Sequence, residues 1–103
     1  MTQEVNYDLE GGAKEFPAFR LYQDSIKIQV YFEDLDGSCN LSIQESTEET
    51  GDYATIEDSI VTAVTGTTSV LFTVLNLKRN TYARVAVSNI EATGIISNIV
   101  IKW

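Results

Sequence analysis

The sequence contains no histidine and a single cysteine, Cys39. Without histidine, the Ser-His-Asp and Cys-His arrangements of nucleophilic enzymes cannot form, and the usual histidine-containing zinc and iron sites are excluded as well. One cysteine cannot close a disulfide within the chain, so the fold needs no oxidising compartment. We therefore expect a protein that is not an enzyme, with no catalytic residue, no cofactor and no metal site.

Basic residues are also few, because 7 lysines and arginines stand against 15 acidic residues and the net charge is -8. Binding to nucleic acid releases counterions through a basic patch, so nucleic acid is not an expected partner. A glycosidase-like pair of carboxylates stays open in principle, although so short a chain offers little room for a sugar-sized cleft.

The acidic residues are unevenly distributed, since 14 of the 15 lie within residues 1–58. One interpretation is an acidic face opposite a nearly neutral face that packs against a partner. The other is that strands from both halves of the chain interleave in space, so that the asymmetry disappears at the surface.

No apolar run approaches the roughly 18 residues that a membrane-spanning helix requires, so no membrane is expected as a partner. The stretch Met1–Asp8 is polar and acidic, and it lacks the basic and apolar regions of a secretory signal. The 103 residues fit one domain with one core.

Alternation of apolar and polar residues is the main structural signal. Ile26 to Phe32 alternates most clearly, and Cys39, Leu41 and Ile43 form the predicted core face of a further strand, which makes Cys39 a buried thiol. Further strands are predicted at 16–22, 53–56, 60–65, 70–75, 81–88 and 95–102. Seven or eight short strands without a helical pattern predict a single antiparallel β-sandwich, immunoglobulin-like or of the jelly-roll type.

Residues 1–13 lack periodicity and end in the pair Gly11-Gly12. We expect a flexible N-terminal arm outside a sandwich domain of residues 14–103, with a role in attachment to a neighbouring molecule and none in stability.

The segment Asp34-Leu35-Asp36-Gly37 resembles the start of a calcium-binding loop, in which oxygen ligands alternate and glycine allows a sharp turn. It lacks the third ligand and the distal glutamate of that motif. Aspartate and glycine also suit a turn between strands, so a turn is the favoured interpretation, and binding of a cation by Asp34 and Asp36 stays open.

Several large side chains fall on the polar faces of their predicted strands, where they either shield their own sheet or form the centre of an interface. Arg84 projects from the face opposite Val85 and Val87, and we expect it to pair with a carboxylate of the acidic half or of a partner. The interface candidates are Tyr7, Tyr31, Tyr82, Arg84 and Trp103.

Short motifs add a resemblance. They are Leu41-Ser42-Ile43-Gln44-Glu45-Ser46, Gly51-Asp52-Tyr53, Leu71-Phe72, Tyr82-Ala83-Arg84-Val85 and Thr93-Gly94-Ile95-Ile96. Together they resemble small β-sandwich proteins in the virions of tailed bacteriophages, of the crAss-like kind. The resemblance implies a structural virion protein assembled in the host cytoplasm. Its expected role is that of an auxiliary capsid (decoration) protein bound to the major capsid protein, with other virion proteins or a second copy of itself as further partners.

A second resemblance competes with the first. The segment Leu77 to Tyr82, with Val85, Val87 and Gly94, is similar to the later strands of fibronectin type III domains. That similarity implies an adhesive, carbohydrate-binding or protein-binding module, and it implies a tyrosine corner at Tyr82. A head-fibre or tail component is a further alternative, because fold alone does not assign function.

Overall fold

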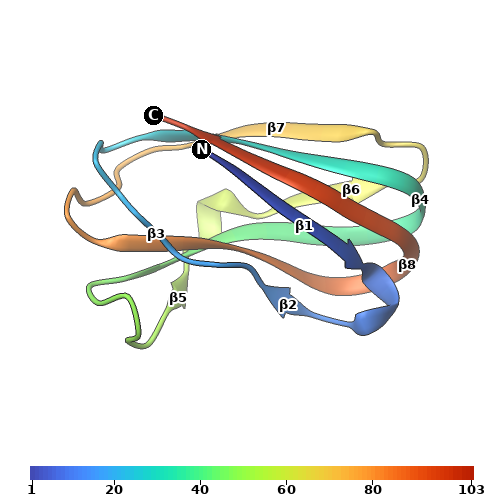
Figure 1. Cartoon of the computed structure of the whole chain (residues 1–103), viewed down its shortest axis with the longest axis horizontal. Coiled ribbons are helices and arrows are strands. Elements are labelled where there is room, and N and C mark those ends of the chain that lie inside the picture. Colours follow the sequence, from blue (N-terminus) through green and yellow to red (C-terminus); the bar gives the residue numbers. More distant parts are fainter.

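A computed structural model describes all 103 residues, and it shows an all-β protein with one antiparallel sheet of eight strands (Figure 1). The elements are β1 Thr2–Asp8, the 3-10 turn η1 Leu9–Gly11, β2 Lys14–Glu15, β3 Phe19–Arg20, β4 Ile26–Ser46, β5 Ala54–Thr55, the 3-10 turn η2 Glu57–Ser59, β6 Val61–Val64, β7 Ser69–Val74 and β8 Tyr82–Lys102. The all-β prediction is confirmed. No helix has the length and apolar character needed to span a membrane.

Two strands of 21 residues each, β4 and β8, form the centre of the sheet. They pair antiparallel along their whole length, from Lys27 opposite Lys102 to Ser46 opposite Tyr82. The first half of β4 also pairs with β7, and its second half pairs with β6 and β5. On β8, the second half pairs with β1 and the first half with β2 and β3. Every shorter strand therefore lies at an edge.

Both long strands bend in the middle, where their pairing is interrupted by shifts of register (Figure 1). In β4 the bend contains Asp34 at φ 55° and Gly37 at φ 114°. A Cβ on Gly37 would lie 2.1 Å from the carbonyl oxygen of Glu91 in β8, so only glycine allows the two strands to approach this closely. The predicted turn at Asp34–Gly37 is wrong, because the same residues form a bulge within a continuous strand.

The predicted strands 81–88 and 95–102 are likewise two parts of β8, joined through a bend with Asn89 at φ 49° and Gly94 at φ 129°. Asparagine and glycine tolerate positive φ in bulges as well as in turns, so the sequence pattern does not distinguish the two.

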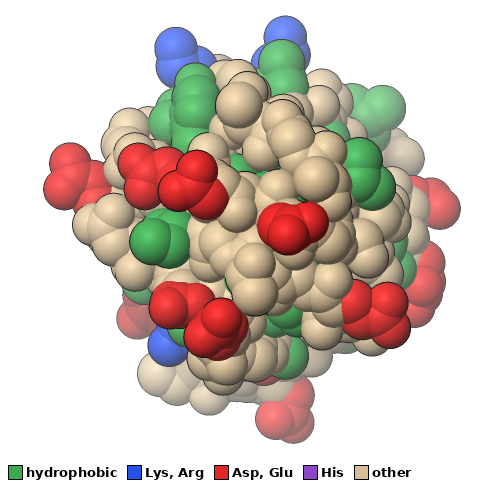
Figure 2. Space-filling model, turned by 90° about the vertical axis from the view of Figure 1, so that its right-hand side faces the viewer, with side chains coloured by type: hydrophobic (Ala, Val, Ile, Leu, Met, Phe, Trp, Pro, Cys, Tyr) green, Lys and Arg blue, Asp and Glu red, His purple; other side chains and the backbone are tan.

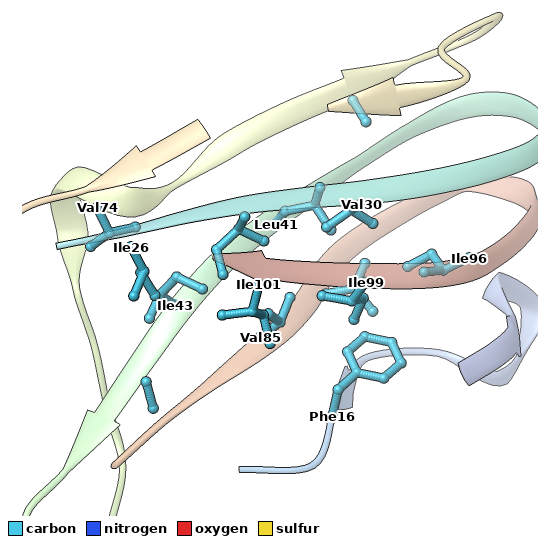
Figure 3. Packing of buried hydrophobic residues seen from close by; sticks show 14 of the residues in the cluster. Phe16, Ile26, Val30, Leu41, Ile43, Val74, Val85, Ile96, Ile99 and Ile101 are labelled. Carbon is cyan, nitrogen blue, oxygen red and sulfur yellow. The ribbon is translucent and has the colours of Figure 1, made fainter. Parts of the chain in front are cut away.

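The core is one cluster of 21 buried residues on the inward face of the sheet. Figure 3 shows Ile26 and Val30 from the first half of β4 in the same cluster as Leu41 and Ile43 from its second half. Cys39 belongs to this cluster, is unpaired and is 1% exposed, which confirms the predicted buried thiol.

The predicted flexible arm is wrong, because residues 2–8 form strand β1 at the edge of the sheet. Gln3, Val5 and Tyr7 are half-buried and alternate with exposed residues, and Leu9 is fully buried. The alternation is present in the sequence, but a glutamine in the first inward position hides it. Pairing with β8 supplies the hydrogen bonds and the apolar surface that the segment lacks alone.

Of the two interpretations of the charge distribution, the structure favours interleaving. β4 comes from the acidic half of the chain and β8 from the nearly neutral half, and the two are neighbours along the entire sheet. The carboxylates are consequently spread around the molecule, as Figure 2 shows for the end at which β4 and β8 bend.

Candidate functional site

Arg84 contacts side chains from three other segments of the chain, which are Gln44, Glu15 and Tyr53. Its Nε donates a hydrogen bond of 2.7 Å to Oε1 of Gln44, which lies opposite it on β4. A terminal nitrogen of Arg84 lies 3.7 Å from Oε1 of Glu15, and the guanidinium carbon lies 4.1 Å from the centroid of the Tyr53 ring. The expected pairing of Arg84 with a carboxylate of the acidic half is therefore confirmed.

These contacts connect the segment between β4 and β5 to the outer surface of the sheet. Tyr53 lies over Arg84, and its hydroxyl donates a hydrogen bond of 2.8 Å to the backbone carbonyl of Glu49. Burial raises the pKa of the Tyr53 phenol, and the nearby positive charge of Arg84 acts in the opposite direction. Within the chain, the Arg84 guanidinium therefore has one hydrogen bond, one ion pair and one aromatic contact.

Three of the motifs that carry the phage resemblance meet at this point. Gln44, Tyr53 and Arg84 come from separate motifs, and all three touch at the Arg84 guanidinium. The sequence shows each motif but does not predict their contact, because the contact depends on the pairing register of β4 with β8.

Tyr82 lies two residues before Arg84 on the same strand and is partly buried. Its hydroxyl makes no hydrogen bond within the chain, so the tyrosine corner implied by the fibronectin type III resemblance is not formed. One of the features that would identify such a domain is therefore missing.

Tyr7 points inward from β1, and its ring meets that of the buried Phe16 edge-on at a centroid distance of 5.7 Å. Its hydroxyl donates to the carbonyl of Gly12. Tyr7 thus stabilises the corner after β1, which gives it a role in packing.

Trp103 lies at the end of the chain against two other aromatic rings. Its ring stacks on Phe19 with a centroid distance of 6.3 Å, and it lies 5.6 Å from the ring of Tyr22. Trp103 is 47% exposed. The two outer rings form a small aromatic patch at the end of the sheet opposite the bend.

Tyr31 belongs to a different surface, which we call the lysine face and define as Lys27, Gln29 and Tyr31 of β4 with Asn98, Val100 and Lys102 of β8. These residues alternate with buried ones, so they project from the outer side of the sheet. They are register partners in the pairs Lys27–Lys102, Gln29–Val100 and Tyr31–Asn98.

The two lysines of this face stand directly opposite each other, an arrangement that is destabilising on a sheet. The structure contains one ion pair, Arg84 with Glu15, so neither Lys27 nor Lys102 has a carboxylate partner. The alternation of Lys27 with Ile26 and Ile28 predicts a polar face, but nothing in the sequence identifies Lys102 as its neighbour. The five interface candidates therefore lie in separate places, with only Tyr82 and Arg84 close together.

The hollows of the surface are shallow. One of about 300 Å³ crosses the outer side of β4 and β8, and its lining residues include Asn40, Ser42, Gln44, Ser88 and Glu57. Another of about 260 Å³ lies at the bend and includes Asp8, Glu10, Glu33 and Asp34. No group of three or more metal-ligating side chains is positioned to hold an ion. Asp36 instead lies 3.5 Å from the hydroxyl of Thr65, which accepts a hydrogen bond from the backbone of Gly37.

Comparisons with models of protein families, with curated proteins and with solved structures found no match.

Proposed function

We propose that this chain is a non-enzymatic structural protein that docks on a larger protein assembly through the lysine face. In the form that the sequence resemblance implies, it is an auxiliary capsid protein of a tailed-phage virion, bound to the lattice of the major capsid protein. The observation that carries the proposal is the pair Lys27 and Lys102, directly opposite each other and without a carboxylate in a chain of net charge -8.

The energetics of that pair favour an acidic partner surface. Two like charges on opposed residues repel, and the repulsion is relieved when a partner places carboxylates between them. Val100 and the exposed Tyr31 lie on the same face and supply apolar and aromatic area, with which interface centres are enriched.

The proposal extends to the architecture of the sheet. We propose that the bent sheet packs against itself as a β-sandwich of immunoglobulin-like or jelly-roll type. Two observations support this arrangement: both halves of β4 contribute to one core cluster, and both central strands carry bulges at the same place.

The proposal can be tested on purified phage particles that carry the gene of this chain. Mass spectrometry and cryo-electron microscopy should find the protein at repeated positions of the capsid surface. Its absence from intact particles would overturn the virion role.

The contact surface is tested by adding purified protein to particles that lack it. The double variant Lys27→Glu/Lys102→Glu should lower occupancy roughly tenfold or more, since contacts between opposite charges become repulsive. The control Lys78→Glu/Arg79→Glu carries the same change in net charge on an exposed turn, and it should bind like the unaltered protein. Equal losses in both variants would show that binding depends on net charge and not on the lysine face.

A second candidate function is a carbohydrate-binding module. It is favoured by the hollow of about 300 Å³ whose lining residues include Asn40, Gln44, Ser42 and Ser88, because amide and hydroxyl groups suit hydrogen bonding to sugars. A glycan array tests the carbohydrate-binding function. Saturable binding that is lost in Asn40→Ala would favour this function, and the absence of binding to any glycan would exclude it.

A further inference from the structure

Strand β7, Ser69–Val74, is an open edge of the sheet. It pairs with β4 along one side, and no strand pairs with its other side. In Figure 1 it lies along the top of the molecule, beyond β4. Its backbone groups on the outer side are therefore available to another strand.

The register shows which groups these are. The backbone N–H of Phe32 donates to the carbonyl of Thr68 at 2.8 Å, which makes that opposed pair a hydrogen-bonded one. Hydrogen-bonded and non-hydrogen-bonded pairs alternate along an antiparallel ladder. Val70, Phe72 and Val74 thus bond to β4, while the backbone groups of Ser69, Leu71 and Thr73 point outward.

This edge lacks the protection that the other edges have. β1 carries two carboxylates and a bulge at Asn6, β2, β3 and β5 have two residues each, and β6 has four. β7 has six residues, Ser-Val-Leu-Phe-Thr-Val, without a charge, a proline or a bulge. Leu71 on this strand is 63% exposed, and Val70 and Phe72 are only partly buried. Such an uncharged and strongly β-forming edge pairs readily with another strand.

We infer that β7 binds β7 of a second copy of this chain, antiparallel and around a two-fold axis at Leu71, so that the two sheets become continuous. The arrangement is self-complementary, as a two-fold interface requires. Leu71 meets its own copy, and Ser69 exchanges backbone hydrogen bonds with Thr73 of the partner. On the inner side Val70 comes opposite Phe72, and each covers the apolar surface that the open edge leaves exposed.

The absence of charge on β7 itself permits a second copy in this position, and the charged side chains beside Leu71 on the outer face are Lys27 and Lys102. With a net charge of -8, most surfaces of the chain repel one another, but β7 and the Thr65–Thr68 turn before it carry no charge. Beside the far end of β7 a hollow of about 310 Å³ is lined by residues that include Glu45, Asp58 and Leu75. The two-fold axis brings Thr67 and Thr68 of the partner toward this end, where hydroxyl groups can donate to the carboxylates.

The inference is independent of the proposed virion role, because it concerns the purified chain alone. Sedimentation velocity over a range up to about 1 mM should show a monomer–dimer equilibrium. Leu71→Lys places two ammonium groups together at the axis and should raise the concentration of half-dimerisation tenfold or more. Val64→Lys is the matched control: it adds the same charge at a residue that is 55% exposed in β6, and it should leave the dimer unchanged.

Cysteine substitution tests the register. In a hydrogen-bonded antiparallel pair the Cα atoms lie about 5.5 Å apart, within the range of a disulfide. Leu71→Cys should therefore form a disulfide dimer under mild oxidation. Thr73→Cys should not, because the two copies of residue 73 lie about 14 Å apart. The native Cys39 is buried and should not interfere.

Three results would overturn the inference. The first is a monomer at every concentration, in which case β7 would be free to pair with a strand of a different protein. The second is an equal loss of dimer in Val64→Lys and Leu71→Lys. The third is equal cross-linking of the two cysteine variants.

Discussion

The guanidinium carbon of Arg84 lies 4.1 Å from the centroid of the Tyr53 ring, and this contact holds the segment between β4 and β5 against the sheet. Gln44 completes the arrangement from the opposite strand with a hydrogen bond of 2.7 Å to Nε of Arg84. The side chain of Arg84 is partly shielded from solvent, being 27% exposed, so these contacts are more effective than those of a fully exposed arginine.

Arg84→Ala should lower the free energy of unfolding by about 1–2 kcal/mol, because it removes a cation–π contact, one hydrogen bond and a weak ion pair. Urea denaturation measures the change. Arg79→Ala, in an exposed turn without such contacts, is the control and should stay within about 0.5 kcal/mol of the unaltered protein. Equal stabilities of the two variants would show that the Arg84 contacts contribute nothing.

Cys39 should react slowly with a thiol reagent in the folded protein and rapidly after unfolding. Its side chain is 1% exposed, and burial raises the pKa of the thiol, so the reactive thiolate is scarce in the folded state. Absorbance during labelling, with and without denaturant, measures both rates. Similar rates would contradict the burial of this residue.

The same pKa shift predicts a dependence of stability on pH. Above a pH of about 8.5 the thiol loses its proton in the unfolded chain but keeps it in the folded protein, so the unfolded state gains stability as the pH rises. The free energy of unfolding should therefore fall as the pH rises from the ordinary pKa of a thiol, about 8.5, to the raised pKa of the folded thiol. Cys39→Ala should lack this part of the fall, and the two proteins should show parallel pH profiles below about pH 8.

Val5→Ala should lower stability by about 1 kcal/mol, because Val5 packs on the core from the inner side of β1. Glu4→Ala lies on the outer side of the same strand and should change stability by less than about 0.5 kcal/mol. Thermal unfolding followed by circular dichroism distinguishes them. If both variants matched the unaltered protein, β1 would contribute to attachment alone.

Gly37→Ala should be among the most destabilising single changes, at more than about 3 kcal/mol, since a Cβ there would lie 2.1 Å from a backbone oxygen of β8 at a φ of 114°. Gly66→Ala has a positive φ of 85° but nothing within 4 Å of its Cβ, so strain alone should cost it about 1 kcal/mol. Chemical denaturation measures the loss of unfolding free energy in both variants, and the difference between them gives the cost of the contact between the new Cβ and β8, apart from the strain of a positive φ. A similar loss in both would show that the bend of β4 can relax.

Much of the secondary structure follows from the sequence alone. The alternation at Ile26–Phe32 and at Cys39–Ile43 identified the inward residues of β4, and the same reasoning placed Val85 and Val87 inward on β8. These predictions succeed because successive side chains of an extended chain point to opposite faces, which is a local property. Burial of one face then requires apolar residues at every second position, and this pattern is visible in the sequence.

Other features were decided by tertiary structure. Aspartate, asparagine and glycine at the bends permit positive φ in a turn and in a bulge alike, so only the pairing of β4 with β8 makes each a continuous strand. β1 forms where β8 offers it an edge, because the weak alternation of its own residues, with the polar Gln3 in the first inward position, does not predict the strand alone.

The surfaces depend most strongly on that pairing. Gln44 and Arg84 lie 40 residues apart in the sequence, and Lys27 and Lys102, which face each other, lie 75 residues apart. A shift of β8 by one residue would turn each outward side chain to the other face and separate both pairs. The sequence by itself determined which residues face outward in the two long strands. The register of these strands decided which of those residues meet, because contacts across a sheet are set by the packing of the whole core.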